Sequence, residues 1–375
     1  LPGMIDPHVH MRDMQQAFKE DWQSGSKAAL RGGVTTVFDM PNTLPASNSR
    51  TNLELKRQRA SKSEIKAKFY LGAENNNLEE LKCMLSQKPQ DICGIKVFLA
   101  ASSANEVVRD RETLGQIFKI AADYNAIIAV HTELQDCLEK FAGKFPPEVN
   151  YHNQIRNRQC AIAGTKMVLD LTNQIKNKLY ITHVSTAEEV ELIRAYKAGN
   201  EIYAEATPHH LLLDESIIPR VGNIGKVNPP LRTKYDREAL WRGIRDGTID
   251  TIGSDHAPHQ LAEKQENYQG APAGFPGLET SLPLMLDAVQ RGYMNFDLLA
   301  DLIAGNTARI FALDNYGSIR VGKKADLVVV NVNGTTVVQP DHFCSKAKYS
   351  PFAGMILRGS VEMTIVDGEI KYRRN

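Results

Sequence analysis

The chain has 375 residues, and its 45 lysines and arginines nearly balance its 44 aspartates and glutamates. No basic or acidic run stands out, which argues against a nucleic-acid partner or a charged membrane surface. No apolar run approaches the roughly 18 residues of a membrane span. The length exceeds what most single cores use, but (β/α)8 barrels routinely exceed about 250 residues.

Short apolar runs rich in β-branched residues alternate with segments of helical spacing along most of the chain. The runs predict eight strands, at residues 4–10, 34–40, 68–73, 94–100, 127–133, 179–185, 201–208 and 251–256. Helical spacing is found between them, at 22–30, 53–60, 78–85, 112–122, 161–171, 187–198 and 236–245. This alternation predicts an α/β fold with a parallel sheet and helices outside it, and eight repeats favour a closed (β/α)8 TIM-type barrel over an open sheet.

The alternation of strands and helices ends at about residue 312. Short strands broken by Gly, Asn and Pro are expected at 317–323, 326–331, 336–339, 354–358, 362–366 and 369–372. We therefore predict a barrel over 1–312 and a small β-domain over 313–375. Because the sequence opens on Leu1-Pro2-Gly3 without an initiator methionine, we expect the natural start upstream, together with the missing N-terminal part of this β-domain.

The cysteines are scattered, odd in number and without a Cys-x-x-Cys pair. There are five, namely Cys83, Cys93, Cys137, Cys160 and Cys344. This distribution predicts reduced thiols in a cytoplasmic protein, and neither a disulfide framework nor a zinc knuckle.

The first predicted strand ends in two histidines, His8 and His10. Residues two apart on a strand point to the same side, so both imidazoles face one spot, which suits a metal ion. Arg12 continues the alternation and is expected to face the same cavity. Taken alone, the pair is equally well explained as two ordinary polar residues at a strand end.

Further polar residues fall at the ends of later strands. Lys96 lies in the fourth strand, His131 and His183 end the fifth and sixth, and Asp255 ends the eighth. The C-terminal rim of a (β/α)8 barrel is where active sites form, so these side chains are expected to converge there with the first two histidines.

Lys96 is unusual because an apolar strand makes a charged lysine costly unless it is neutralised or paired. Reaction with carbon dioxide gives a carbamate, an anion with two oxygens that can bridge two cations. Two such ions about 4 Å apart activate a water molecule at neutral pH. The alternative is a salt bridge to Asp255 or Glu205.

The motifs together resemble the amidohydrolase superfamily and, within it, the dihydroorotases of the cyclic-amidase branch. They stand at residues 6–12, 39–43, 94–98, 129–131, 182–185, 207–211, 226–232, 254–259 and 274–279, so that the resemblance covers nearly the whole chain. It implies two zinc ions, held by His8, His10 and Asp255 on one side and by His131 and His183 on the other. It also implies that carboxylated Lys96 bridges the two ions and that Asp255 acts as general base and then acid.

The resemblance also implies a substrate pocket for a small molecule. Arg12, Asn42 and His259 match the family's set for the ring carboxylate, and a guanidinium suits a carboxylate because its planar fork allows two parallel hydrogen bonds. The positions that touch the pyrimidine ring are matched by Asn228, Gly274 and Phe275. The implied reaction is reversible hydrolysis of L-dihydroorotate to N-carbamoyl-L-aspartate, in pyrimidine biosynthesis.

Other readings remain open. The nearest is another cyclic amidase, a hydantoinase, dihydropyrimidinase or allantoinase, although rings without a carboxylate have no need for an arginine at the position of Arg12. A second alternative is a non-catalytic homologue that serves as a scaffold for a transcarbamoylase. The presence of all six implied metal ligands argues against it. A homo-oligomer, with a dimer favoured, and an aspartate transcarbamoylase partner are further expectations.

The sequence departs from the family in one loop and leaves several histidines without a ligand role. Many relatives follow the arginine with Glu-Pro-Gly, where this chain has Asp13-Met14-Gln15. The loop 100–105 stands where some dihydroorotases carry a mobile lid, which we adopt as a hypothesis. His209 and His210 are expected to end the seventh strand in structural roles, and His256 to face away from the cavity.

Overall fold

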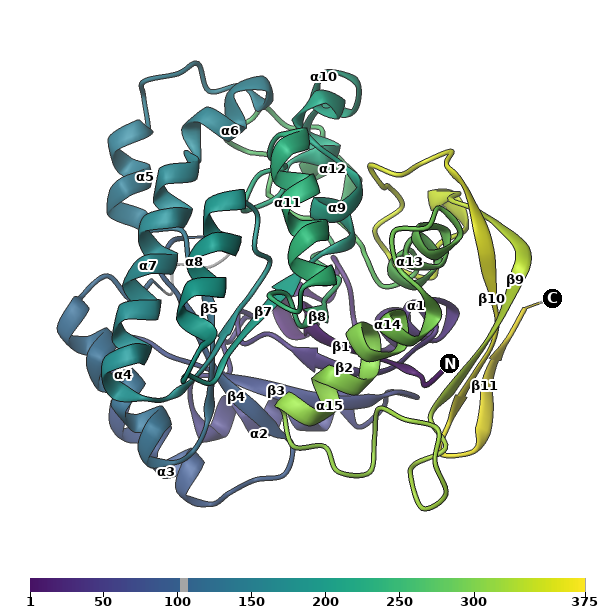
Figure 1. Ribbon diagram of the computed structural model, residues 1–375, viewed down its shortest axis with the longest axis horizontal. Coiled ribbons are helices and arrows are strands. Elements are labelled where there is room, and N and C mark those ends of the chain that lie inside the picture. The colour runs from purple at the N-terminus through teal and green to yellow at the C-terminus, as the bar shows by residue number, and fades with distance from the viewer. Residues whose placement is uncertain (102–106, 375) are drawn as a thin grey trace.

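The computed structural model describes residues 1–101 and 107–374 (Figure 1). Eight parallel strands follow one another around a barrel in sequence order. They are β1 (Met4–Val9), β2 (Val34–Asp39), β3 (Lys66–Gly72), β4 (Ile92–Phe98), β5 (Ile127–His131), β6 (Lys178–Ile181), β7 (Ile202–Ala206) and β8 (Thr251–Ile252). A parallel bridge between Val9 and His256 joins the last segment to the first, so the predicted TIM-type barrel is confirmed.

Helices cover the outside of this barrel (Figure 1). The longer ones are α1 (Trp22–Arg31), α2 (Arg50–Ala60), α3 (Leu78–Ser86), α4 (Arg111–Asp123), α5 (Gln135–Phe141), α7 (Arg158–Ile175), α8 (Ala187–Lys197), α11 (Lys234–Arg245) and α13 (Ser281–Gln290). The short ones are α6 (His152–Ile155), α9 (Pro208–Leu212), α10 (Ile218–Val221), α12 (Leu261–Lys264), α14 (Phe296–Ala300) and α15 (Asn306–Ile310).

All seven predicted helices exist, and four of them begin earlier than their apolar spacing indicates. The first turns of α2, α4, α7 and α11 are polar, and each starts behind a side-chain N-cap, Ser49, Asp110, Asn157 and Thr233 respectively. An N-cap accepts a hydrogen bond from an unpaired backbone N–H, so it defines a helix start where hydrophobic periodicity is silent.

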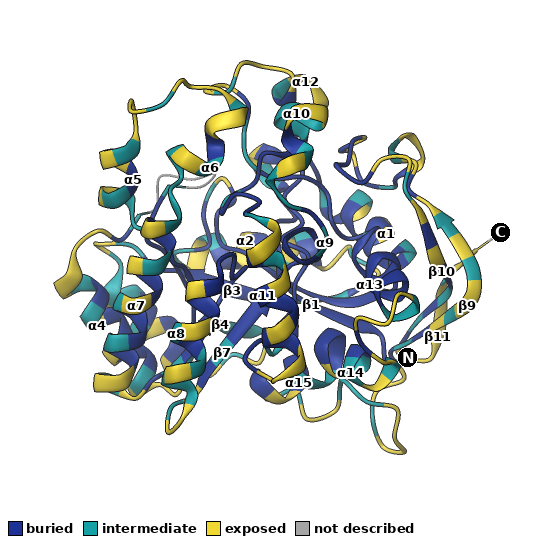
Figure 2. Ribbon diagram, turned by 45° about the horizontal axis from the view of Figure 1, so that its top comes forward, coloured by how far each residue is buried: buried dark blue, intermediate teal, exposed yellow. Residues whose placement is uncertain are grey.

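The core lies between the strands and the inner faces of the helices, as the dark strands of Figure 2 show. Phe311, which follows α15, packs its ring edge-on against Phe38 and Tyr180, with centroids 4.9 and 5.3 Å apart, and also contacts Tyr70. These partners come from β2, β6 and β3. A side chain that touches strands so far apart in the barrel must lie inside it, and Phe311 therefore fills the interior.

The C-terminal tail forms a separate antiparallel sheet in the order β11-β10-β9, which confirms the small β-structure predicted for this part of the chain. Its strands are β9 (Leu327–Val337), β10 (Ile356–Val366) and β11 (Glu369–Arg373). The prediction of six short strands is wrong: the segment 317–323 is not a strand, and the four pieces that follow merge into β9 and β10. Gly359, read as a break, lies within β10 at a register shift with φ +94°, because a glycine can bend a strand without ending it.

The prediction of five reduced cysteines is wrong for two of them. Cys137 and Cys160 form a disulfide, with Cα atoms 5.3 Å apart, while Cys83, Cys93 and Cys344 are free. The two residues are 23 positions apart in sequence and meet because α5 and α7 pack together after β5. No short motif carries that information. A search of the described residues for a membrane-spanning helix finds no candidate.

Candidate active site

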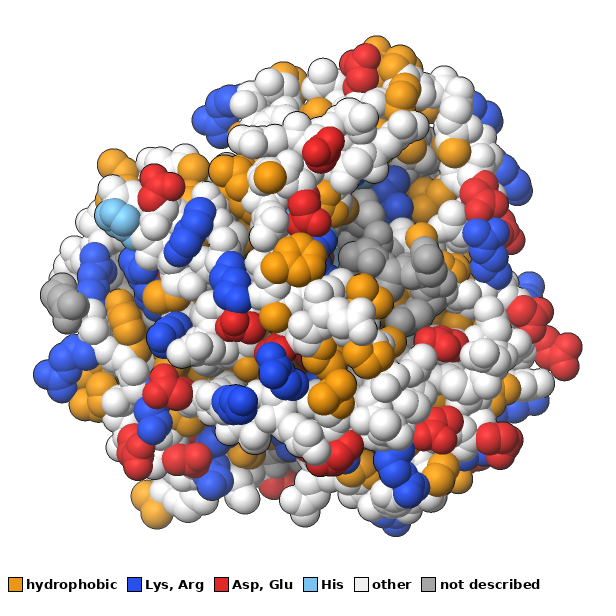
Figure 3. Space-filling model, turned by 180° about the vertical axis from the view of Figure 1, so that it is seen from behind, with side chains coloured by type: hydrophobic (Ala, Val, Ile, Leu, Met, Phe, Trp, Pro, Cys, Tyr) orange, Lys and Arg blue, Asp and Glu red, His pale blue; other side chains and the backbone are white. Residues whose placement is uncertain are grey.

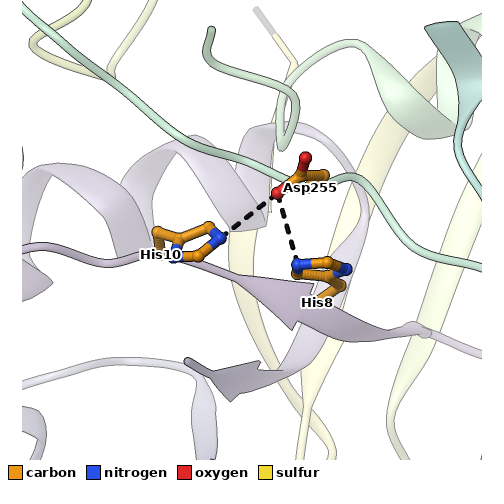
Figure 4. A group of neighbouring side chains, drawn as sticks. All are labelled: His8, His10 and Asp255. Atoms are coloured by element: carbon orange, nitrogen blue, oxygen red, sulfur yellow. Dashed lines mark ion pairs between the residues drawn. The ribbon is translucent and has the colours of Figure 1, made fainter. Parts of the chain in front are cut away.

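The first group of predicted ligands converges at the C-terminal end of β1. Nε2 of His8 lies 3.3 Å and Nε2 of His10 lies 3.2 Å from Oδ1 of Asp255, and all three side chains are buried (Figure 4). The other oxygen of Asp255 points away from both imidazoles (Figure 4). Two nitrogens and one oxygen at these separations fit one divalent ion at the usual distance of about 2.1 Å.

Two buried acceptors orient the imidazoles of this group. Nδ1 of His8 lies 2.7 Å from Oε1 of Glu205, and Nδ1 of His10 lies 2.6 Å from Oδ1 of Asn42. A carboxylate or amide oxygen accepts, so each Nδ1 carries a hydrogen, which leaves each Nε2 as the nitrogen that faces Asp255 and is available to a metal ion.

The second predicted pair also meets. Nδ1 of His131 lies 3.0 Å from Nε2 of His183. Nε2 of His131 lies 3.1 Å from Oε2 of Glu133, which in turn accepts from Arg156, so the lone pair of His131 is on the side of His183. The backbone N–H of His183 donates to Oε1 of Glu205 over 3.0 Å. Glu205 thus contacts one residue of each predicted half-site.

Lys96 is fully buried, and its Nζ donates to Oγ1 of Thr182 over 3.1 Å. Within the described chain it forms no ion pair with a carboxylate, so the alternative of a salt bridge to Asp255 or Glu205 is not found. Burial lowers the pKa of Lys96 to about 8, although both carboxylates act to raise it. A buried amine without a directly paired carboxylate is the group that carbamate formation would neutralise.

The protonation states of the cluster suit metal binding. Burial lowers the pKa of His10 to about 3 and that of His183 well below its usual range, so both rings are neutral near pH 7. Burial acts to raise the pKa of Asp255, but His8 and His10 outweigh it and hold that pKa well below normal. Neutral imidazoles beside an ionised carboxylate are the donor forms that divalent metals require, so these residues fit the implied ions.

Three predicted site residues have left-handed backbone conformations. The φ angles are +58° at Arg12, +36° at His183 and +47° at Asp255, and none of these residues is glycine. Such conformations cost on the order of 1–3 kcal/mol each and persist only where the surroundings enforce them. Oδ1 of Asp6 accepts from the backbone N–H of Ser254 over 3.0 Å, which secures the turn at Asp255.

Arg12 and His259 lie together, as predicted. Arg12 is 1% exposed; its Nη2 lies 3.1 Å from Nε2 of His259, and its Nε donates to the carbonyl of Pro258 over 3.2 Å. Asn42 meets His10 through its amide oxygen, a contact that the sequence did not predict. Asp13, where this chain departs from the Glu-Pro-Gly of many relatives, stabilises the loop next to Arg12. Its carboxylate accepts from the backbone N–H of Trp22 over 3.1 Å and from the side chain of Arg59.

The residues predicted to touch the ring lie around a loop that follows α12. A cavity of about 320 Å³ is lined by Asn228 and Ala273 among others, and the side-chain oxygen of Asn228 is buried without a hydrogen bond from the described chain. Gly274 has φ +119°, and a Cβ there would come within 2.7 Å of Ala257, so only glycine fits. Phe275 is buried, with its ring 4.9 Å from that of His209.

Other histidines have structural roles, with one correction to their placement. His209 and His210 belong to the short helix α9 and do not end β7, because Thr207 caps a helix that has Pro208 in its first turn. His210 bonds Thr207 and the carbonyl of Pro229. Nδ1 of His256, a residue predicted to face away from the cavity, accepts from the backbone N–H of Gly277 over 3.1 Å. Most of the predicted lid, 102–105, lies outside the described residues.

Sequence reasoning missed the supporting roles of Glu133, Glu205 and Lys19. Glu133 stands two residues after His131, so strand alternation could have placed both on one side. Glu205 entered only as a partner for Lys96. Lys19, whose Nζ lies 3.0 Å from Nδ1 of His259, lies 240 positions from it in sequence and no motif includes it.

The sequence profile of the amidohydrolase family matches residues 1–371. A protein named dihydroorotase from Methanosarcina mazei is 35% identical over 95% of this chain and 80% of its own length. Its namesake from Pyrococcus horikoshii is 36% identical, over 99% of this chain and 80% of its own length.

Solved structures agree on the fold. The L-hydantoinase (dihydropyrimidinase) from Arthrobacter aurescens superposes with a TM-score of 0.95 at 28% identity, over 100% of this chain and 85% of that one. A dihydropyrimidinase from Brevibacillus agri gives a TM-score of 0.92 at 26% identity, covering 100% and 84% of the two chains. The chain therefore belongs to the amidohydrolase family, a family of metal-dependent hydrolases, on the branch that holds the dihydroorotases.

Proposed function

We propose that this chain is a dihydroorotase, which interconverts L-dihydroorotate and N-carbamoyl-L-aspartate in pyrimidine biosynthesis. The observation that carries the proposal is the buried guanidinium of Arg12 beside His259, on the same rim as the His and Asp cluster. A guanidinium presents a planar fork of N–H donors that suits a carboxylate, and dihydroorotate carries a carboxylate on its ring. Relatives named dihydroorotase at 33–36% identity support the same reading.

We further propose two zinc ions at this rim. His8, His10 and Asp255 would hold one and His131 and His183 the other, with Lys96, as its carbamate, between them. Support comes from the convergence of ring nitrogens and a carboxylate oxygen described above, from the buried position of Lys96 and from its lack of an ion-paired carboxylate in the described chain. Bound divalent ions supply an acidified water and polarise the ring amide carbonyl.

The chain's own residues then move the proton and hold the substrate. Asp255 accepts the proton of the attacking water through a carboxylate oxygen and delivers it to the ring nitrogen as the carbon–nitrogen bond breaks. Arg12, Asn42 and His259 would hold the ring carboxylate, and the ring would rest against Asn228, Gly274 and Phe275. Fixing the ring in this way lowers the entropic cost of reaching the transition state.

A second candidate is a cyclic amidase for uncharged rings, because the solved structures named above are hydantoinases and dihydropyrimidinases. The two candidates separate in a side-by-side hydrolysis assay of the zinc-loaded protein on dihydroorotate, dihydrouracil, hydantoin and allantoin. We expect turnover on dihydroorotate alone. Preference for an uncharged ring would favour the cyclic amidase for uncharged rings. No turnover with metal bound would favour the non-catalytic scaffold for a transcarbamoylase.

Further proposals concern the setting of the enzyme. Three free thiols support a reducing, cytoplasmic compartment, while the disulfide between Cys137 and Cys160 opposes it. Figure 3 shows charges of both signs interspersed over one face, which supports a small-molecule partner over nucleic acid.

We also propose that the chain divides into a barrel over 1–312 and a small β-domain over 313–375, that it forms a homodimer, and that an aspartate transcarbamoylase is a candidate partner. Light scattering of the purified protein, alone and with that enzyme, tests the last two.

A further inference from the structure

Residues 268–274, here called the wall segment, form one side of the cavity that Asn228 lines. The segment contributes five lining residues to this cavity of about 320 Å³, namely Tyr268, Gln269, Ala271, Pro272 and Ala273. Just beyond it, the carbonyl of Phe275 accepts from the backbone N–H of Ala257 over 3.0 Å. Ala257 follows Asp255 by two residues, so the end of the wall segment lies beside the backbone that carries the proposed proton acceptor.

The wall segment consists of turns and bends, with neither helix nor strand. Its carbonyl groups therefore need hydrogen-bond donors from outside regular secondary structure. Nζ of Lys226 donates to the carbonyls of Tyr268 and Ala271, over 2.5 and 2.6 Å. The same ammonium lies 4.1 Å from the centre of the Tyr268 ring, a cation–π contact. One lysine thus holds the first half of the segment.

Lys264, at the end of α12, holds the second half. Its Nζ donates to the carbonyls of Pro272 and Gly274, over 2.8 and 3.0 Å, and to the carbonyl of Lys226 over 3.2 Å. Burial and the charge of Lys226 lower the pKa of Lys264. Three carbonyl oxygens around one nitrogen nevertheless call for three N–H groups, which only the ammonium form has.

The backbone and the two side chains form one connected network. The carbonyl of Lys226, which accepts from Lys264, also accepts from the backbone N–H of Gly274 over 2.9 Å. Lys264 is 2% and Lys226 8% exposed, and in the described part of the chain neither forms an ion pair with a carboxylate. Two buried ammonium groups without such a partner are costly, so the position of the wall segment is specified at the expense of stability. That expense indicates a role other than stability.

We propose that Lys226 and Lys264 are positioning residues that fix the wall segment in the shape that the substrate ring requires. The inference rests on the proposed function, in which the ring lies against Asn228, Gly274 and Phe275, and it names the side chains that set this pocket. A wall held in place before binding saves the cost of ordering it when the ring enters.

The first test is steady-state kinetics of the zinc-loaded Lys264→Met variant with dihydroorotate. Lys264 is the better choice because Lys226 itself lines the cavity. Methionine keeps an unbranched side chain but donates no hydrogen bond. KM should rise at least about fivefold and kcat should change less than about twofold, because the wall contacts the ring in the ground state and the transition state alike. Lys82→Met, which removes an exposed lysine paired with Glu79 on α3, is the matched control and should leave KM unchanged.

The second test follows the wall segment itself by chymotrypsin cleavage after Tyr268. Fragments that end at Tyr268 and begin at Gln269 are identified by mass spectrometry. Cleavage should be at least about fivefold faster in Lys264→Met than in the wild type or in Lys82→Met, because proteolysis reports local opening. The inference requires both changes: a faster cleavage with unchanged KM would show a purely structural role, and a raised KM with unchanged cleavage would show that Lys264 does not act through the wall segment. Either result would overturn it.

A further variant covers the case in which Lys264→Met does not fold. Lys264→Gln retains two N–H donors, and we expect the same two changes at a smaller size, judged by the same criterion. Absence of dihydroorotate turnover in the wild type would refute the proposed function. The cleavage comparison would then still decide whether Lys264 holds the wall segment, so the two failures are distinguishable.

Discussion

Glu205 shows how much of the site depends on a single buried residue. It accepts from Nδ1 of His8, from the backbone of His183 and from the hydroxyl of Tyr180, over 2.7, 3.0 and 3.0 Å. One carboxylate thereby orients a predicted ligand of each metal ion. Groups that orient metal ligands typically affect metal affinity by about 10–100-fold.

We therefore predict that Glu205→Gln weakens zinc binding by about tenfold or more, because an amide has one oxygen fewer with which to accept. Zinc per chain, measured after dialysis against a zinc buffer, checks this. Glu201→Gln, which changes an exposed carboxylate just before β7, is the control and should retain the wild-type content. Equal zinc content in the two variants would contradict the assigned role.

Asp255 is predicted to carry the proton transfer. Asp255→Asn keeps the size of the side chain but removes the basic oxygen, so kcat should fall by about 10²–10⁴-fold while the protein stays folded. Steady-state kinetics with a circular dichroism spectrum of the same sample measures both. Near-normal turnover in a folded variant would refute the assignment.

For single residues, the sequence could predict only those contacts that the local geometry of one strand determines. His8 and His10 were found because strand alternation puts them on one side, and the structure shows them meeting Asp255. The contact of Lys19 with His259 and that of Glu205 with His8 join residues 240 and 197 positions apart, and no local pattern encodes such distances. The left-handed backbone at Arg12, His183 and Asp255 was equally invisible, because only a small minority of non-glycine residues adopt it, even among aspartates and histidines.

At the scale of elements, the loop from β6 to α8 fixes the segment that follows His183. Thr186 caps α8 and forms a capping box with Glu189. The buried carboxylate of Glu189 also accepts from the backbone and hydroxyl of Ser185, over 3.2 and 3.1 Å, and from Thr165 on α7 over 2.9 Å. One side chain thus joins a helix start, a strand end and a neighbouring helix.

Glu189→Ala should lower the free energy of unfolding by about 2–4 kcal/mol, because it leaves several buried donors unpaired. Urea unfolding followed by circular dichroism measures the change. Glu191→Ala removes an exposed glutamate from the same helix and should cost less than about 1 kcal/mol. Similar losses in the two variants would show that the buried network does not carry this stability.

The outcome of the element predictions follows from the same physics. All eight barrel strands were found because buried parallel strands are short, apolar and bounded by helices. The half-exposed strands of the small sheet contain Gly and Asn, which the sequence reading took as breaks. The strands continue through these residues because the pairing of β10 with β9 contains register shifts. Such shifts depend on the partner strand.

At the scale of the whole molecule, Glu279 joins the barrel to the C-terminal tail. It precedes α13, and its carboxylate accepts from the backbone N–H groups of Cys344 and Ser345 over 2.9 and 3.1 Å. Figure 1 shows the small sheet lying beside α1 and α13, with the N-terminus next to it. Burial raises the pKa of Glu279 to about 7, in spite of these two hydrogen bonds.

A raised carboxyl pKa gives a defined dependence of stability on pH. Between the ordinary pKa of about 4.5 and the folded pKa of about 7, the folded state binds more protons than the unfolded state, so stability falls as the pH rises. We predict that the wild type loses roughly 3 kcal/mol from this group between pH 4.5 and 7.5, and that Glu279→Gln loses less. Thermal unfolding across this range checks it, with Glu238→Gln, at an exposed site on α11, as control. Parallel curves for wild type and Glu279→Gln would contradict the prediction.

The central claim is that a metal-dependent hydrolase site has been given a carboxylate-selective pocket by Arg12 and His259. The most direct test is the ratio of kcat/KM for dihydroorotate to that for dihydrouracil, in wild type and in Arg12→Met. We predict a ratio of at least about 10³ in the wild type, falling by at least about tenfold in Arg12→Met because dihydroorotate alone loses its partner. A wild-type preference for dihydrouracil, or a ratio that Arg12→Met leaves unchanged, would contradict the account.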